Sequence, residues 1–178
     1  GSCLRLVPPA AAGRGAPGYR RPLSPARPHA PSHGHAFVTL LTSLNDAQRN
    51  IARYPKSPGD VVVGPGRDWA FPAAPQGLPA SNLGPDQRAM LMAAIETYVR
   101  DVDNENAEHI LARYRSELDR TFIGFAGAPT LTAAGDYVRI DGPSVWIEFV
   151  MDTPFSFPAP HPHTVWRDKR TDYGGYRG

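Results

Sequence analysis

The chain has 178 residues, of which 41% are hydrophobic and 20% are charged, a composition typical of a soluble globular protein. This length is enough for one domain with a substantial core and leaves little room for two. No apolar run approaches the ~20 residues of a membrane helix, so we expect no membrane partner. The single cysteine, Cys3, excludes an internal disulfide framework.

Positive charge is concentrated at the N-terminal end. Residues 1–35 contain five arginines and no acidic residue, whereas the whole chain has 19 basic and 17 acidic residues. Taking five from 19 leaves 14 basic residues against the same 17 acidic ones, so residues 36–178 carry a net charge of −3. Binding to nucleic acid requires a basic face on the folded body. We therefore predict that the chain has no nucleic-acid partner.

Residues 1–35 show neither helical nor strand periodicity and contain seven of the 20 prolines. This composition predicts a disordered or loosely packed tail rich in proline, alanine and arginine. The same composition is also expected from GC-rich DNA read out of frame, or from a truncated gene. The pattern places a single folded domain at residues 36–178, with a helical part at 36–120 and antiparallel strands at 121–170.

Helical periodicity marks three segments. Residues 37–54 have apolar side chains at helical spacing, with Ser43 or Asn45 as the cap of a second helix. Residues 84–102 begin with Pro85 in the first turn, and residues 103–120 present one apolar face. Between these helices we expect a short strand at 61–64 and a long loop at 64–85. The sequences LNDAQR and LGPDQR, which start at Leu44 and Leu83, share the pattern L-x-x-x-Q-R.

After residue 120 the apolar period changes from 3.6 to 2, which predicts short strands at 121–128, 136–140, 144–150 and 163–168. Helices followed by strands indicate an α+β fold, with the N-terminal helices packed on one face of a small antiparallel sheet. If DGPS (141–144) is a four-residue turn, Ile140 pairs with Val145 and Tyr137 pairs with Glu148. One face of this hairpin is then apolar. The other carries Tyr137, Arg139, Trp146 and Glu148, either as a functional surface or as stabilising cross-strand pairs.

The stretch HPHTVWRD is the clearest candidate site. On a strand, His161, His163 and Arg167 point to one side, and Trp166 and Asp168 point to the other. Two imidazoles on one side of a strand are a common geometry for two ligands of one metal ion. Glu148 on the neighbouring strand would complete a 2-His-1-carboxylate set suited to Zn, Fe, Mn or Cu. The alternative is that the histidines are ordinary polar residues and that Arg167, Asp168 and Asp172 form a salt-bridge cluster.

The ordered series Y-x-R-I-x-G-P, W-I-E, H-x-H, R-D and D-Y-G resembles the bacterial and fungal family catalogued as domain of unknown function 3500, over residues 37–175. The matching positions are Tyr137, Arg139, Gly142, Pro143, Glu148, His161, His163, Arg167, Asp168, Asp172, Tyr173 and Gly174. Members of that family are typically longer, with an N-terminal half that bears a glycine-histidine-histidine segment. That half is not recognisable here. The compartment of this chain is left open; the resemblance implies a soluble, bacterial-type protein whose full-length relatives are exported. Because a half-length member lacks part of the family pattern, we expect a homodimer that completes its core by pairing.

Together these features favour a metal-dependent hydrolase that acts on a small ester, lactone or amide through metal-activated water. His161, His163 and Glu148 are the expected metal ligands, with zinc favoured over copper, iron or manganese. Arg139 and Arg167 would hold the small-molecule substrate, and Asp168 or Asp172 would orient a ligand or act as the base. The expected substrate-binding aromatics are Tyr137, Trp146, Trp166 and Tyr173. The alternatives are a copper or iron oxidoreductase, a non-catalytic peptide- or carbohydrate-binding domain, and an inactive truncated family member.

Overall fold

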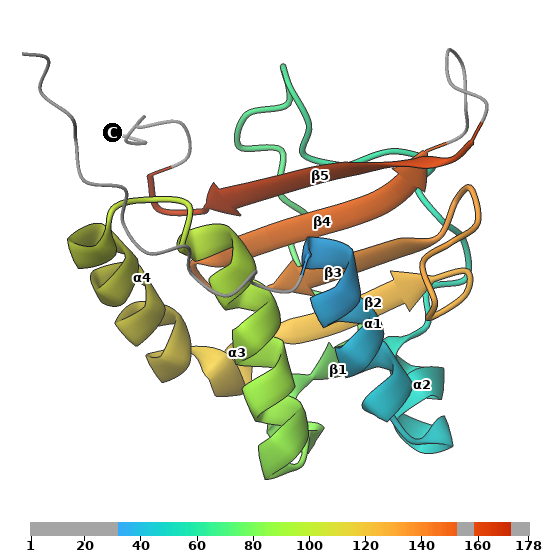
Figure 1. Ribbon diagram of the computed structural model, residues 1–178, viewed down its shortest axis with the longest axis horizontal. Coiled ribbons are helices and arrows are strands. Elements are labelled where there is room, and N and C mark those ends of the chain that lie inside the picture. Colours follow the sequence, from blue (N-terminus) through green and yellow to red (C-terminus); the bar gives the residue numbers. More distant parts are fainter. Residues whose placement is uncertain (1–31, 153–158, 172–178) are drawn as a thin grey trace, which may run out of the picture.

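A computed structural model describes residues 32–152 and 159–171 of the chain. In these ranges four α-helices pack on one face of a five-stranded sheet, as Figure 1 shows. The helices are α1 (His33–Ser43), α2 (Asp46–Ala52), α3 (Pro85–Val99) and α4 (Asn104–Ser116). The strands are β1 (Leu78–Pro79), β2 (Phe122–Ala126), β3 (Tyr137–Asp141), β4 (Val145–Asp152) and β5 (His161–Asp168). Two short 3₁₀ turns, η1 (Ala80–Asn82) and η2 (Leu118–Arg120), follow β1 and α4.

The sheet is an antiparallel meander in the order β1-β2-β3-β4-β5, which confirms the predicted α+β fold. β5 lies at one edge of the sheet and β1 lies at the other. The predicted strand at 61–64 is wrong, because these residues form turns that pack against the sheet. β1 is not predicted from the sequence, because it has only two residues and one of them is Pro79, a residue that disfavours strands.

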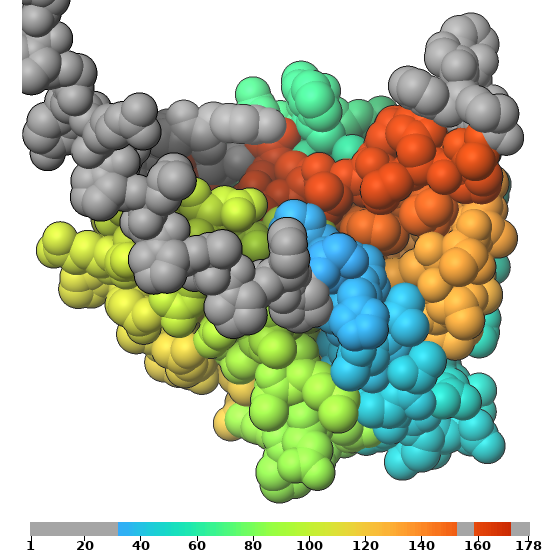
Figure 2. Space-filling view, in the orientation of Figure 1, coloured from blue at the N-terminus to red at the C-terminus, as the bar shows by residue number. Residues whose placement is uncertain are grey.

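The two faces of the sheet differ in what covers them. Alternate side chains of β3 and β4, such as Val138, Ile140 and Ile147, join the main core beneath α1, α3 and α4. The space-filling view in Figure 2 shows this helix-covered side, with α1 in blue and α3 in green at the front. The opposite face lies against the segment between α2 and β1, the green trace behind the sheet in Figure 1. No helix among the described residues is long and apolar enough to cross a membrane.

The β3–β4 hairpin has a different register from the predicted one. Arg139 pairs with Glu148 and Ile140 pairs with Ile147, two residues away from the expected partners. The turn is shorter than DGPS because Pro143 and Ser144 alone form it, and the Gly142 N–H donates to the Val145 carbonyl at 2.8 Å. Since strand side chains alternate, a shift of two residues leaves each of them on its predicted face.

Helix α1 begins three residues earlier than the predicted domain boundary at residue 36. The Ser32 hydroxyl accepts a hydrogen bond from the His35 N–H at 3.4 Å, and the His33 ring stacks on Tyr98 of α3 with 3.9 Å between ring centres. Apolar periodicity does not reveal this turn, because its contacts are made by histidine and serine side chains. The remainder of the predicted tail, residues 1–31, lies outside the described residues.

The shared L-x-x-x-Q-R pattern has a structural counterpart at the starts of α2 and α3. Gln48 accepts from the Asn45 N–H at 3.0 Å, and Gln87 accepts from the Gly84 N–H at 3.0 Å, so each side chain caps its own helix. The two side-chain amides also bond to each other in both directions, at 2.9 Å each. The pattern thus ties the first turns of two helices together.

Candidate functional site

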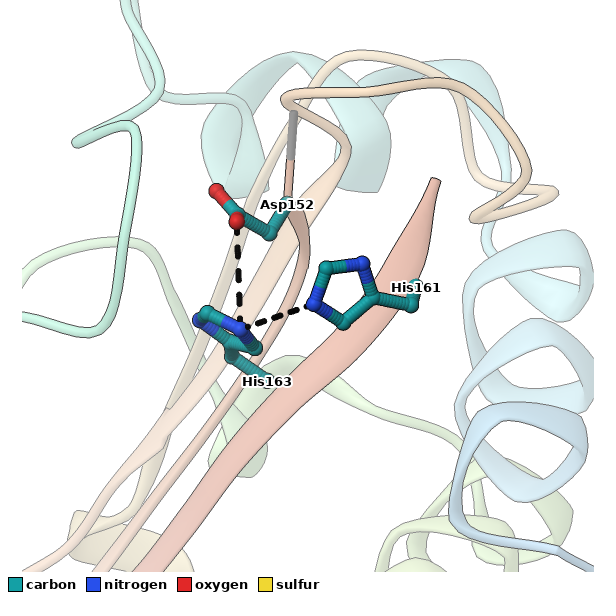
Figure 3. Close-up of side chains that lie close together, drawn as sticks. All are labelled: Asp152, His161 and His163. Atoms are coloured by element: carbon teal, nitrogen blue, oxygen red, sulfur yellow. Dashed lines mark hydrogen bonds and ion pairs between the residues drawn. The ribbon is translucent and has the colours of Figure 1, made fainter. Parts of the chain in front are cut away.

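The end of β4 and the start of β5 bring three metal-ligand side chains together. Asp152, the last residue of β4, pairs with His161, the first residue of β5, and His163 pairs with Val150. Asp152, His161 and His163 therefore project from the same face, as Figure 3 shows. One ligand atom from each lies within 4.8 Å of the other two. This is the one such group of three among the described histidines, cysteines and carboxylates.

The distances inside this group suit a single ion. The Nε2 atoms of His161 and His163 lie 3.2 Å apart, and the Asp152 Oδ2 lies 3.8 Å from the His163 Nε2. Two nitrogens bonded at about 2.05 Å to a tetrahedral zinc ion are about 3.3 Å apart. The side chains of His163 and Asp152 are 38% and 25% exposed, so solvent reaches the group.

Asp60 approaches the other nitrogen of His163. Its Oδ1 lies 3.0 Å from the His163 Nδ1. A carboxylate accepts hydrogen bonds, so this contact places a proton on Nδ1 and leaves the lone pair of a neutral ring on Nε2, towards His161. A carboxylate behind a metal-bound imidazole is a recurring feature of metal sites, because it fixes the tautomer and orientation of the ring.

The electrostatics of Asp60 agree with this geometry. Burial raises the pKa of this carboxyl, but the hydrogen bonds from His163 and from the Val61 N–H outweigh burial and hold the pKa below its usual value. The Val61 N–H donates to Oδ1 at 2.7 Å. Asp60 is therefore ionised over the neutral pH range and can stabilise positive charge on or beyond His163.

The segment that carries Asp60 is held to the sheet by two buried charged residues. Glu148 of β4 accepts from the Val62 and Val63 N–H groups at 2.7 and 2.9 Å. Arg167 of β5 donates through Nε to the Val63 carbonyl and through Nη2 to the Gly64 carbonyl, at 2.8 Å each. One side chain binds the amides of the turn and the other binds its carbonyls. We call this arrangement the turn clamp.

The structure does not bring Glu148 into the metal-ligand group, contrary to the sequence expectation. Glu148 pairs with Val165, and its side chain is fully buried beneath the segment between α2 and β1. Besides the two backbone amides, its oxygens accept from the Tyr137 hydroxyl at 2.6 Å and from the Trp146 Nε1 at 2.8 Å. Four donors satisfy this carboxylate, and Asp152 takes the expected place of Glu148 beside the histidines.

Arg167 and Asp168 also occupy structural positions. Arg167 is 3% exposed, and besides the turn clamp its Nη1 forms an ion pair with Asp68 at 3.0 Å. Asp168 projects from the helix-facing side of β5, where Arg113 of α4 and the Tyr114 hydroxyl bind it. Both residues thus make structural contacts, and the structure does not bring either into the histidine group. Asp172 lies outside the described residues.

The aromatic side chains expected to bind substrate are mostly covered. Tyr137 and Trp146 are 1% and 0% exposed, because both lie under the segment between α2 and β1. Trp166 is half-buried against α4, where its Nε1 donates to the Tyr114 hydroxyl at 3.2 Å. These three do not form an open aromatic platform. Tyr173 lies outside the described residues.

The family described as Protein of unknown function (DUF3500) matches residues 27–175 of the chain. This is more than half of its length. The chain belongs to the DUF3500 family. No curated protein and no solved structure matches it. The motif residues of this DUF3500 chain thus have separate positions in the fold. His161 and His163 lie in the metal-ligand group, whereas Glu148 and Arg167 form the turn clamp.

Two residues of the site in this DUF3500 protein were missed. Asp152 shares the face of Glu148 by strand alternation, so a complete β4–β5 register would have identified it. That register could not be set, because eight residues separate the two strands. Asp60 reaches His163 across 103 residues of chain and carries no local pattern.

Proposed function

We propose that this domain binds one divalent transition-metal ion, with zinc favoured, through Asp152, His161 and His163, and that it hydrolyses a small ester, lactone or amide. The observation that carries the proposal is the 3.2 Å separation of the two Nε2 atoms, with Asp60 bound to the far nitrogen of His163. The Asp60 carboxylate fixes which nitrogen of His163 faces the His161 ring. This arrangement is expected for a metal ligand and is not required of a surface histidine.

The donor set supports hydrolysis over a purely structural role. Three protein ligands leave at least one coordination position open, whereas structural zinc sites use four protein ligands. A bound ion in such a site supplies Lewis acidity and lowers the pKa of a bound water towards neutrality. In this chain Asp152 would contribute negative charge beside the water, and Asp60 would keep His163 in its ligating tautomer.

A hollow next to the group offers space for a small substrate. It has a volume of about 290 Å³ and is lined by the turn residues Pro58, Asp60, Val61, Val62, Gly64, Pro65 and Arg67. Asp60 belongs both to this lining and to the contact with His163, so the hollow adjoins the proposed metal centre. Arg67 is exposed at this hollow and is suited to pair with a developing negative charge on a bound substrate.

An iron oxidoreductase is the second candidate, and one observation favours it. Two histidines and one carboxylate with open positions are also the ligand set of non-haem iron(II) oxygenases. The metal that the protein selects therefore separates the two functions. Peptide or carbohydrate binding through Tyr137 and Trp146 receives no support, because both rings are buried.

Elemental analysis of the purified protein tests metal binding. The protein is stripped with a chelator, exposed to equal concentrations of zinc, iron(II), copper(II) and manganese(II), and desalted. We expect one equivalent of zinc, and its loss in the His161→Ala/His163→Ala and Asp152→Ala variants. His109→Ala is the matched control, since His109 is exposed on α4 away from the group. A wild-type protein that retains no metal, or variants that retain all of it, would contradict the proposal.

Activity is then tested on the zinc form with chromogenic esters, lactones and anilides. Hydrolysis that requires zinc and is lost in Asp152→Ala supports the hydrolase. Selective retention of iron(II), with oxygen consumption and no hydrolysis, would replace it with the oxidoreductase.

A further inference from the structure

A second hollow, of about 330 Å³, lies on the same side of the sheet, between β3 and the segment that follows α2. Its lining residues are Tyr54, Pro55, Lys56, Ser57, Pro58, Val62, Gln76, Tyr137 and Arg139. Two of these residues are cationic and none of them is acidic. None of the three metal-ligand residues lines it, and it shares only Pro58 and Val62 with the first hollow.

Aromatic rings hold the guanidinium of Arg139 in place. It lies 4.9 Å from the centre of the Tyr54 ring and 5.0 Å from that of Trp146. The Tyr54 ring reaches this position because it lies directly over Gly124 of β2, where any Cβ would overlap its ring atoms. The guanidinium is thus fixed before any ligand arrives, which reduces the entropic cost of binding.

The hydrogen-bonding capacity of Arg139 is largely unused. Its Nε and Nη2 are enclosed and have no hydrogen-bond partner among the described residues. Its nearest ion pair, from Nη2 to the Asp141 Oδ2, is long at 4.0 Å, and the other oxygen of Asp141 is bound by Lys169 at 2.5 Å. Arg139 is 6% exposed, and a buried guanidinium with unused donors is costly unless a further acceptor completes it.

The local charges indicate what kind of acceptor would fit. Arg139, Lys56 and Lys169 are positive, whereas Asp141 and Glu148 are negative, so the five groups leave one excess positive charge. Glu148 is already satisfied by four donors and gives Arg139 no hydrogen bond. A monoanion neutralises this excess, whereas a dianionic phosphate would reverse it.

We propose that this hollow binds the carboxylate of a small organic monoanion, held between the Arg139 guanidinium and the Lys56 ammonium. Arg139 would supply the fixed, directional contact, and Lys56 at the exposed rim would supply a mobile charge. The Tyr54 hydroxyl, which lies near Arg139 and donates to the Gln76 carbonyl at 3.0 Å, marks one wall of the site.

This site is separate from the proposed metal centre and does not depend on it. Tyr137, Val150 and His163 form one row across β3, β4 and β5, so Tyr137 lies two strands, or about 10 Å, from His163. The Val61 side chain packs against the cluster of Ala126, Tyr137 and Val150, which includes two residues of this row. A carboxylate in the hollow therefore cannot also be a metal ligand.

The test is a titration of ¹⁵N-labelled full-length protein with sodium acetate, with a chelator present throughout and ionic strength balanced by sodium chloride. We expect saturable shifts of the Lys56 and Ser57 amide signals, with a dissociation constant on the order of 1–10 mM. At about pH 8, where inorganic phosphate is mostly dianionic, neither phosphate nor chloride should produce saturable shifts at these amides. Propionate should bind at least as tightly as acetate, since the hollow has room for a larger group.

Three variants test whether acetate binds at the second hollow. Lys56→Gln should weaken acetate binding roughly three- to five-fold, because it removes one partly screened charge. Arg139→Gln should abolish binding. Arg67→Gln, which removes an exposed cation that lines the first hollow and not the second, should leave the acetate-induced shifts of Lys56 and Ser57 unchanged. Arg139 is buried against two aromatic rings, so Arg139→Gln also perturbs packing, and the Lys56→Gln and Arg67→Gln pair decides the question by itself. Shifts that do not saturate, that chloride or phosphate reproduces, or that are equal in Lys56→Gln and wild type overturn the proposal.

Discussion

Asp60 and His163 are 103 residues apart in the chain, yet the Asp60 Oδ1 lies 3.0 Å from the His163 Nδ1. Glu148 and Arg167 explain this proximity, because they bind the amides and carbonyls of the turn that follows Asp60. A buried carboxylate and a buried guanidinium on neighbouring strands thus position a third charged residue beside the proposed metal ligands. This relationship gives separate expectations for Asp60 and for Glu148.

Asp60 is expected to affect metal affinity and not the fold. Asp60→Ala should weaken zinc binding about 10- to 100-fold, the usual effect of removing the carboxylate behind a ligating histidine. Asp60→Asn should weaken it less, because the amide oxygen still accepts from Nδ1. Competition with a chromogenic chelator measures the affinities, and Asp46→Asn, at an exposed position of α2, is the control. Equal affinity in Asp60→Ala and wild type would remove Asp60 from the site.

Glu148 is expected to affect stability in the absence of metal. Glu148→Gln replaces one acceptor oxygen with a donor that faces donors, which should cost about 2–4 kcal/mol of unfolding free energy. Urea denaturation of the chelator-treated protein measures this loss, with Glu105→Gln on the exposed side of α4 as the control. A Glu148→Gln protein with the unfolding free energy of wild type would contradict the turn clamp.

Buried tyrosines predict loss of stability at alkaline pH. Burial raises the pKa of Tyr54 to about 12 and also raises the pKa values of Tyr98, Tyr114 and Tyr137 above their ordinary value of 10.0. A raised folded-state pKa means that the unfolded chain releases the proton more easily. The stabilising contribution is therefore complete below about pH 10 and is lost as pH rises through about 10 to 12.

Absorbance at 295 nm and urea denaturation across this range test the expectation. In the native protein, the signal for these four tyrosines should appear only together with unfolding. Ionisation of all seven tyrosines of the chain near pH 10 without unfolding would contradict the described burial.

The paired amides of Gln48 and Gln87 predict coupling between two helix starts. Gln87→Ala removes the cap of α3 and two bonds to Gln48, and should cost about 1–2 kcal/mol of unfolding free energy. The double variant with Gln48→Ala should cost clearly less than the sum of the single variants, because each single change leaves the other amide without its partner. Denaturant unfolding of wild type, the two single variants and the double variant gives the coupling energy. Additive losses of unfolding free energy would contradict coupling between Gln48 and Gln87.

The sequence predicted which face of the sheet each side chain lies on, but not which groups that side chain contacts. Strand alternation placed Tyr137, Arg139 and Glu148 on one side and His161 with His163 on the same side, and a two-residue shift of register preserved this result. Alternation does not reveal what covers a face. The covering segment has no regular structure and is rich in proline and glycine, so its contacts with Glu148 could not be read from periodicity. For that reason a buried structural carboxylate was expected to be a metal ligand.

Anomalous diffraction from zinc-soaked crystals is the most direct test of the proposed metal centre. We predict one peak at the zinc edge, with the ion about 2.0–2.2 Å from the Nε2 atoms of His161 and His163 and from a carboxylate oxygen of Asp152, as expected for protein zinc sites. No peak at this group, or a peak whose ligands include Glu148 instead of Asp152, would contradict it.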